Sequence, residues 1–522
     1  MIHRGSRTFP GLLAAMALVA TVLVPSVEAQ AVPPIDFDSI DAYVRAEVEA
    51  SALPGLSYAI VRDGEVIHVA AFGTADPTGR AMTTDTPVVI GSVGKTLTAL
   101  AIRQLIDAGR IDENAPVQRY LPWFTLATPQ TAAGITIRSL LDQTSGFSRA
   151  DGQRQSTYRP GLTSEEVVRG LGSVAVNRPV GTFEYSNLNY ITLGVVVETV
   201  SGQPYAEYLQ DHVFAPLGMT HSYAAREPAT RDGLAQGHRY LFGLPVAWDE
   251  PYPTAIVPAG YQISTASDMA RYAAALSNHG LYRGTDIVGD TGGDRDYGIY
   301  WEPLTGVTPG ETPGHSGATQ TENASLIFMP IQHLGVVVLA NANPTQLWVG
   351  DTRGAYEIAF DVLRLAWGEE PMTGGYTVRT SYLVVDAVLL LLAGILVVEV
   401  LRLRGWRRRL AAASRPRLAL LPSFVVDVVL PLSILVALPL WISTMGISPP
   451  FDVLGIWALV MWTLPDIGAS LIAISAGLLI VGVVKAWQLR SRAGDESMQG
   501  RRLGPVPHRA SLGATSAPRG SV

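Results

Sequence analysis

The 522-residue sequence predicts an α+β domain followed by three membrane-spanning helices. Two pairs of strand-like segments frame the first two thirds of the chain, with helical segments between them. The last third holds three long apolar stretches, and only 16% of all residues are charged, which suits a chain that lies partly in lipid. No Cys is present, which excludes disulfides, thiolate metal sites and a cysteine nucleophile. The net charge of −7 argues against nucleic acid as a partner.

The N-terminus has the organisation of a secretory signal peptide. His3, Arg4 and Arg7 form a basic segment, residues 11–24 are apolar, and small residues follow up to Ala29. We therefore expect residues 1–29 to be a signal peptide. An uncleaved anchor helix is the alternative, although the apolar run is short for a 30 Å hydrocarbon core. Both interpretations place the following domain outside the cytoplasm.

Residues 35–368 are expected to form one extracytoplasmic domain. Segments 56–61 and 65–72 are rich in β-formers and are joined through Asp63-Gly64, a strong hairpin signal. Segments 324–329 and 335–339 predict a second hairpin. Between the hairpins, residues 95–108 and 190–200 are helical in pattern. Gly109 and Gly202 follow these two segments as helix-ending residues. Strands at both ends of a domain with helices between them indicate an antiparallel sheet beside a helical region.

The membrane region is predicted from hydropathy and charge. We expect a linker at 369–380, a first span at 381–401, a basic cytoplasmic loop at 402–419, a second span at 420–444, a third span at 453–487 with an interfacial piece at 453–463, and a disordered cytoplasmic tail at 488–522. Basic residues gather after the first and the third span, and the loop at 445–452 has none. The positive-inside rule therefore places both basic segments in the cytoplasm. The basic residues of the loop and the tail are Arg402, Arg404, Arg407, Arg408, Arg409, Arg415, Arg417, Lys485, Arg490, Arg492, Arg501 and Arg502.

Ser92 and Lys95 are the first chemical candidates. The chain has only two lysines, Lys95 and Lys485, among 38 basic residues. An amine, unlike a guanidinium, can lose its proton when it is buried and act as a base. Ser92 lies three residues before Lys95 at the start of an apolar helix, so both share one face, and the helix N-terminus favours a developing oxyanion. An interpretation in which Ser92 is a helix cap and Lys95 a surface residue stays open.

Two further segments carry candidate groups. In Tyr185-Ser186-Asn187, the phenol can pass a proton and the amide can orient a substrate and bind the lysine. In Gly314-His315-Ser316-Gly317, the glycines allow a substrate backbone to approach an edge strand. His315 and Ser316 would supply polar contacts, and the amide of Ala318 would supply an oxyanion donor. Taken alone, either segment is equally compatible with a polar turn.

Together and in this order, these segments resemble the serine β-lactamase/penicillin-binding-protein superfamily, especially its class C β-lactamase, esterase and D-aminopeptidase branch. The resemblance covers roughly residues 38–365. It implies a five-stranded antiparallel sheet flanked by helices, beside an all-helical region, with the site between them and no metal or other cofactor. It also implies that Ser92 is acylated, that Lys95 and Tyr185 share the work of a general base, and that the Ser92 and Ala318 amides form the oxyanion hole. Asn187, His315, Ser316 and Gly317 would then contact the substrate.

The sequence departs from this family pattern at three positions. His315-Ser316-Gly317 stands where β-lactamases and D-Ala-D-Ala peptidases have Lys-Thr-Gly, so a fixed cation is replaced by an imidazole that is mostly neutral at pH 7. We therefore expect esters, amides or peptides, including D-amino-acid peptides of the cell wall, to be better substrates than β-lactams. Gly94 stands where relatives often have Ser, with little effect expected. Gln143 stands where His is frequent, and the sequence gives no physical reason for it.

The function expected from the sequence is therefore a serine hydrolase in a bacterial cell membrane, with its catalytic domain outside. Its partners would be a small-molecule or peptide acyl substrate and the lipid bilayer. The alternative is a penicillin-binding-like receptor that is acylated once, or that only binds cell-wall peptides. A metalloenzyme is disfavoured because the nine histidines form no His-Glu-x-x-His pattern. A Ser-His-Asp hydrolase is disfavoured because no Gly-x-Ser-x-Gly elbow occurs.

Overall fold

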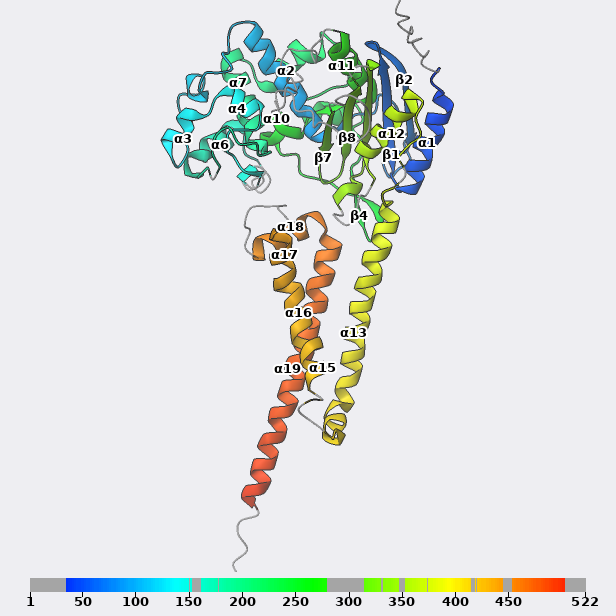
Figure 1. The fold of residues 1–522 in the computed structure, drawn as a ribbon, viewed down its shortest axis with the longest axis vertical. Coiled ribbons are helices and arrows are strands. Elements are labelled where there is room, and N and C mark those ends of the chain that lie inside the picture. The colour runs from blue at the N-terminus through cyan, green and yellow to red at the C-terminus, as the bar shows by residue number, and fades with distance from the viewer. Residues whose placement is uncertain are drawn as a thin grey trace, which may run out of the picture.

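The structure, a computed structural model, describes residues 34–149, 151–152, 161–176, 178–278, 314–329, 332–346, 353–372, 374–414, 418, 420–444 and 453–502. A globular α+β domain occupies one end, and long helices extend away from it (Figure 1). The predicted fold class is confirmed. The expected signal peptide at 1–29 lies outside the described residues.

The main sheet has five antiparallel strands in the order β2-β1-β9-β8-β7. Its members are β1 (Gly55–Arg62), β2 (Glu65–Gly73), β7 (Gly314–Ala318), β8 (Asn323–Met329) and β9 (Leu334–Ala340). Both predicted hairpins are present. Asp63 and Gly64 have φ of +53° and +76°, the positive values that a two-residue hairpin turn requires. Because β1 pairs with β9, the two ends of the domain meet at the middle of the sheet.

Helices cover both faces of this sheet, since side chains alternate between two apolar clusters. Ala59 and Val61 of β1 pack in the cluster that contains α2 (Gly94–Asp107) and α11 (Ala266–Asn278). Tyr58 and Ile60 of the same strand pack in the cluster that contains α1 (Phe37–Ala50) and α12 (Ala355–Trp367). The strand β7 lies at the edge of the sheet, which leaves one of its sides free to border a functional site.

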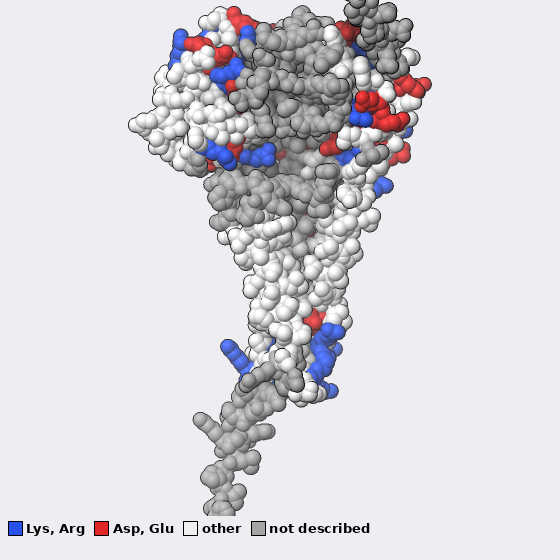
Figure 2. Space-filling view, in the orientation of Figure 1, with Lys and Arg blue, Asp and Glu red and all other residues white. Residues whose placement is uncertain are grey.

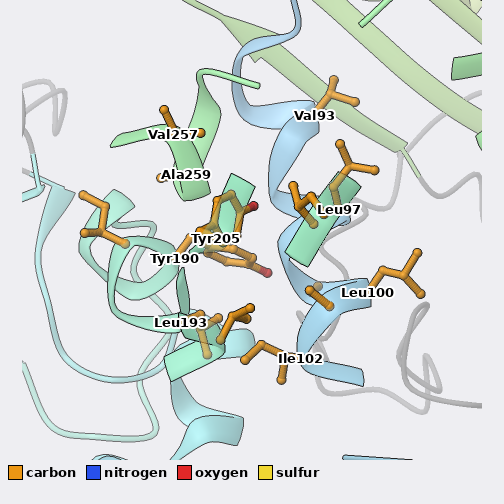
Figure 3. Packing of buried hydrophobic residues seen from close by; sticks show 14 of the residues in the cluster. Val93, Leu97, Leu100, Ile102, Tyr190, Leu193, Tyr205, Val257 and Ala259 are labelled. Carbon is orange, nitrogen blue, oxygen red and sulfur yellow. The ribbon is translucent and has the colours of Figure 1, made fainter. Parts of the chain in front are cut away.

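The helical region lies beside the sheet on the α2 side (Figure 1). Its main helices are α3 (Pro129–Gly134), α4 (Ile137–Leu141), α6 (Ser164–Arg169), α7 (Asn187–Ser201), α8 (Tyr205–Leu209) and α10 (Val257–Gly260). Figure 3 shows how side chains of α2, α7 and α10 interdigitate, among them Leu97, Leu193 and Val257. This packing fixes the start of α2 against α10 and α7. Gly109 and Gly202, with φ of +67° and +79°, follow α2 and α7 as predicted.

Two short sheets complete the globular part. The strands β3 (Val88–Val89) and β6 (Ile263–Ser264) pair just before the start of α2. The strands β4 (His238–Leu241) and β5 (Leu244–Ala247) form a hairpin. This hairpin lies where the globular domain meets the long helices (Figure 1).

Among the residues that the structure describes, three helical segments are long and apolar enough to cross a membrane: Val378–Ala412, Leu421–Ile442 and Pro465–Ser491. The first is α13 (Val378–Ala412) and the third belongs to α19 (Pro465–Arg502). The second is built from α15 (Leu421–Phe424), α16 (Leu430–Leu432) and α17 (Leu438–Thr444), joined by two π-helical turns, η8 (Val425–Val429) and η9 (Ser433–Ala437).

The boundaries in this region differ from the expected ones. The helix α13 includes residues 378–380 of the expected linker and residues 402–412 of the expected loop, because Arg, Leu and Ala are strong helix formers that prolong an existing helix. The expected third span is divided at Leu464 into α18 (Val453–Thr463) and α19, because Pro465 favours a first helical position. Residues 488–502, expected to be disordered, are helical.

Candidate active site

Ser92 lies in a 3₁₀ turn, η1 (Gly91–Val93), that leads directly into α2. The backbone before it is unusual. Gly91 has a φ of +52°, and a Cβ at this position would lie 2.5 Å from the Ala318 amide nitrogen. Only glycine permits both this conformation and this approach of β7. Ser92 is therefore held at the junction of the sheet, α2 and α10, with its side chain partly exposed.

Lys95 lies one turn further along α2 and is only 1% exposed. Its Nζ donates to Asn187 Oδ1 at 2.8 Å and to the Ala259 carbonyl, and it lies 3.0 Å from Ser92 Oγ. All three partner oxygens are neutral. Burial, and secondarily the charge of Arg149, holds the pKa of Lys95 well below its usual value. A lysine in this setting is shifted toward the neutral amine, which is the form that can take a proton from the Ser92 hydroxyl.

Tyr185 approaches Ser92 from the helical region. Its Oη lies 2.7 Å from Ser92 Oγ, and Lys95 Nζ lies 4.9 Å from the centre of its ring. Tyr185 comes just before α7, and Asn187 is the first residue of that helix. The predicted phenol, amide, amine and hydroxyl are thus brought together by segments more than ninety residues apart.

The segment that carries Tyr185 is held by Gln143, for which the sequence offered no role. Gln143 is fully buried and has a φ of +59°. Its Oε1 accepts from the Ser186 amide at 2.9 Å and from the Asn189 side chain, and its backbone carbonyl accepts from the Glu184 amide at 2.9 Å. Gln143 therefore positions both neighbours of Tyr185. Its departure from the histidine that is frequent at this position was the signal that the sequence gave.

Arg149 is a second residue that the sequence did not identify. Its guanidinium lies 5.3 Å from the centre of the Tyr185 ring, and the residue is exposed. Its backbone amide donates to Glu184 Oε1 at 3.2 Å. Its positive charge opposes protonation of Lys95 and would favour a developing phenolate on Tyr185.

The strand β7 supplies the other side of the site. The Thr319 amide donates to the Glu322 carbonyl across the β7–β8 pair, so by the alternation of an antiparallel ladder the Ala318 amide points away from β8. A Cβ added to Gly317 would lie 3.0 Å from the Ser92 nitrogen, so this part of β7 lies against η1. The Ala318 and Ser92 amides are consequently neighbours, which is the arrangement that an oxyanion hole requires.

His315 and Ser316 lie on opposite faces of β7. His315 is 5% exposed and shares the face of Gly317 that lies against η1, whereas Ser316 is exposed on the other face. The His315 Nδ1 lies 2.6 Å from the Ser316 carbonyl oxygen. Burial, and secondarily the charge of Lys95, lowers the pKa of His315 to about 3. The imidazole is therefore neutral, and the Ser316 side chain is not on the face that meets Ser92.

Packing against Gln262 explains why glycine stands at position 94, which the sequence did not reveal. A Cβ at Gly94 would lie 1.8 Å from Gln262 Oε1. The Gln262 side chain is fully buried, and its Nε2 donates to the Gly94 carbonyl at 3.1 Å and to Tyr205 Oη at 2.9 Å. The expectation that Gly94 has little effect therefore needs correction, because any side chain there must displace this amide.

Comparisons with known proteins bear on the family and the fold. A family model described as Beta-lactamase matches residues 40–360. Protein flp of Staphylococcus aureus (strain MW2) is 26% identical over 312 residues, which are 58% of this chain and 63% of that protein. Penicillin-binding protein 4 of Amycolatopsis lactamdurans is 34% identical over 235 residues, which are 44% of this chain and 61% of that protein. The chain thus spans less than two thirds of the length of both relatives.

One solved structure supports the fold alone. The octameric penicillin-binding protein homologue from Pyrococcus abyssi superposes with a TM-score of 0.54 and 24% sequence identity. The match covers 65% of this chain and 79% of that one. The residues that the family model matches, 40–360, lie in the globular domain.

Proposed function

Because the chain belongs to the beta-lactamase family, whose members are serine hydrolases, we propose that it is a membrane-anchored, extracytoplasmic hydrolase that works through an acyl-enzyme. The proposed substrates are esters, amides or peptides, including D-amino-acid peptides derived from the cell wall. The observation that carries the proposal is the contact of the buried Lys95 amine with the Ser92 hydroxyl at 3.0 Å.

The acylation step follows from the contacts of Ser92. Its Oγ attacks the substrate carbonyl carbon while its proton passes to the neutral Lys95 amine or, through the 2.7 Å contact, to Tyr185. The carbonyl oxygen becomes an oxyanion and accepts hydrogen bonds from the Ser92 and Ala318 amides. The carbon–heteroatom bond then breaks. Whichever of Lys95 and Tyr185 took the proton gives it to the departing amine or alkoxide, and an ester to Ser92 remains.

Deacylation uses the same groups in the same order. Water gives a proton to Lys95 or Tyr185 as its oxygen attacks the acyl carbon, and the tetrahedral oxyanion forms again between the two amides. When it collapses, the Ser92 oxygen leaves and recovers a proton, so the acid is released and the enzyme is regenerated. Asn187 holds the Lys95 amine at 2.8 Å, which keeps the base oriented through both steps.

The preference for substrates other than β-lactams rests on His315. Because the pKa of this buried imidazole is lowered to about 3, it offers no cation to a substrate carboxylate at neutral pH. Arg149, whose guanidinium lies 5.3 Å from the centre of the Tyr185 ring, is a source of positive charge beside the site. We therefore infer that uncharged acyl groups, or carboxylates reaching Arg149, are accepted better than a carboxylate directed at β7.

The proposed orientation follows from charge. Basic side chains gather at the ends of the long helices that lie farthest from the globular domain (Figure 2). On α13 they include Arg402, Arg404 and Arg407. The positive-inside rule assigns this end to the cytoplasm and the globular domain to the opposite side. The sequence groups Lys485 with the basic residues of the cytoplasmic tail. In the structure it instead contacts Glu399 and Asp427 between the helices.

A hydrolysis panel tests the proposed function. The full chain in detergent is offered short acyl esters, D-aminoacyl amides, muropeptides and a chromogenic cephalosporin, with Ser92→Ala as the matched control. We expect turnover of an ester, amide or peptide that Ser92→Ala abolishes, with slow or no cephalosporin hydrolysis. Stoichiometric acylation without turnover of any class would support the receptor alternative, and rapid cephalosporin hydrolysis would contradict the assigned preference.

A further inference from the structure

The β4–β5 hairpin has an exposed aromatic tip with an unusual backbone. The register pairs Leu241 with Leu244, which leaves Phe242 and Gly243 as the two turn residues. Their φ values are +50° and +74°, as a type I′ turn requires. Asn or Asp usually precedes Gly in this turn, and a bulky residue at positive φ is a strained exception. Phe242 is nevertheless 51% exposed and Leu244 67% exposed, so neither side chain is kept there by burial in the protein.

The hairpin is fastened to the first turns of two spanning helices. The Phe242 amide donates to Asp466 Oδ2 at 2.7 Å, in the first turn of α19. Tyr382 Oη, one turn into α13, donates to the Tyr240 carbonyl at 3.0 Å. Arg239 donates to the Thr463 carbonyl at 3.0 Å, at the end of α18. The tip therefore lies at the level along the helix axes where both spans begin.

At this level the surface of the spanning helices becomes apolar. Directly after Tyr382, Leu383 and Val384 of α13 are 70% and 59% exposed. Exposed leucine and valine continue along α13, as expected for side chains that face acyl chains. A phenylalanine and a leucine exposed beside the first turn of such a helix have the position of the aromatic belt at a membrane surface.

A groove beside the hairpin continues this surface. It has a volume of about 800 Å³ and lies between β5 and the end of α1. Residues that line it include Ala52, Leu53, Pro54, Leu244, Val246 and Arg379. Glu49 and His238 also line it, so the wall is mixed in polarity. Arg379 is exposed in the first turn of α13 and adds a positive charge. Apolar side chains beside charged ones match the layer where lipid headgroups meet acyl chains.

We propose that the β4–β5 hairpin is embedded in the outer headgroup layer of the bilayer, with Phe242 and Leu244 against the acyl chains and Arg379 among the lipid phosphates. This inference rests on the three helices lying in a membrane and does not depend on catalysis. The globular domain is joined to the membrane through the segment that leads into α13. The hairpin would give it a second place of contact with the lipid. The hairpin would hold the domain at a fixed height and tilt above the lipid.

The absence of Cys from the chain makes a direct test simple. Phe242→Cys and Leu244→Cys are made separately in the full chain, labelled with a nitroxide and placed in nanodiscs of phosphatidylcholine and phosphatidylglycerol. Collisions with oxygen, which enters lipid, are compared with collisions with a water-soluble nickel chelate. Leu390→Cys on α13, 73% exposed, is the lipid reference. Glu227→Cys on α9 (Arg226–Arg231), whose side chain is 85% exposed, is the water reference.

We expect both hairpin labels to favour oxygen over nickel, as the Leu390 label does. A nickel accessibility at either hairpin position equal to that of the Glu227 label would overturn the proposal. Thermal unfolding of each variant verifies that the domain is folded. Val246→Cys replaces any variant that unfolds, because Val246 lies two residues along β5 on the same face as Leu244. Its label should also favour oxygen, and a nickel accessibility equal to that of the Glu227 label would overturn the proposal.

Discussion

Arg149 and Lys95 both lie beside the ring of Tyr185, and the charge of Arg149 acts on the Lys95 amine. The guanidinium lies 5.3 Å and the amine 4.9 Å from the centre of that ring. The exposed arginine charge lowers the pKa of the buried lysine, in addition to the larger effect of burial. An exposed residue outside the predicted motifs thus takes part in keeping the lysine amine available as a base.

Arg149→Gln should therefore move the pH dependence of hydrolysis. Removing the positive charge raises the pKa of Lys95, so a higher pH is needed to obtain the neutral amine. We expect the acidic limb of the kcat/KM profile to shift to higher pH, with a smaller change in its plateau. Arg149→Lys, which keeps the charge, is the control and should leave the limb close to that of the wild type. A limb that stays in place in Arg149→Gln would show that Arg149 does not influence the base.

His315→Lys should change substrate preference. A lysine on the face of β7 that meets η1 offers a cation where the native imidazole, with its pKa lowered to about 3, is neutral. A charge-assisted hydrogen bond contributes about 1.5–3 kcal/mol, so we expect kcat/KM for an acyl substrate with a free carboxylate to rise about tenfold relative to its methyl ester. His315→Gln, which remains neutral, should keep the wild-type ratio of kcat/KM between the carboxylate substrate and its methyl ester. An unchanged ratio in His315→Lys would mean that this face of β7 does not meet the carboxylate.

Glu322 should make stability depend on pH. Burial, and secondarily the nearby Glu250 carboxylate, raises the pKa of Glu322 to about 7, above its ordinary 4.5. The folded chain then holds a proton that the unfolded chain releases, so this contribution is complete below pH 4.5 and is lost as pH rises to about 7. We expect Tm to fall across this window in the wild type and less steeply in Glu322→Gln. Identical slopes for the two proteins in thermal melts would contradict the raised pKa.

Lys485 should hold the spanning helices together. Its amine contacts Glu399 of α13 at 2.5 Å and Asp427 of η8 at 2.6 Å, and its side chain is 4% exposed. Lys485→Met leaves the buried Asp427 carboxylate without its cation and leaves Glu399 with the 3.6 Å contact to Arg402. Breaking a buried pair costs about 3–5 kcal/mol. We expect a lower unfolding temperature in nanodiscs, measured by the far-UV helix signal. The triple variant Lys485→Met, Glu399→Gln, Asp427→Asn removes the stranded charges and should recover part of the loss. A single variant as stable as the wild type would refute this role.

Local sequence patterns predicted the fold well, because their causes are local. The Asp63-Gly64 turn, the glycines after α2 and α7, and the spacing of Ser92 and Lys95 depend on neighbours within a few residues. Apolar stretches likewise predicted the three spanning segments. The ends of α13 and α19 were misplaced, because helix formers carried each helix past its apolar part.

The groups that support the site could not be predicted, because their partners are distant in the sequence. Gln143 holds Ser186 and Asn189 across more than forty residues, and Gln262 occupies the space beside Gly94 from 168 residues away. Arg149 affects Lys95 only because folding brings its charge near the amine. Ser316 was expected beside the substrate, but strand alternation turns it to the other face of β7.

Mass spectrometry of the acylated full chain tests the proposed chemistry most directly. After a short incubation with an acyl ester, we expect the acyl mass on the peptide that contains Ser92, and none on that peptide in Ser92→Ala. Lys95→Met should keep the hydroxyl but slow acylation by ~10²–10⁴-fold, the usual contribution of a positioned base. Acyl groups found elsewhere at equal rates in the wild type and both variants would contradict a nucleophilic Ser92 activated by Lys95.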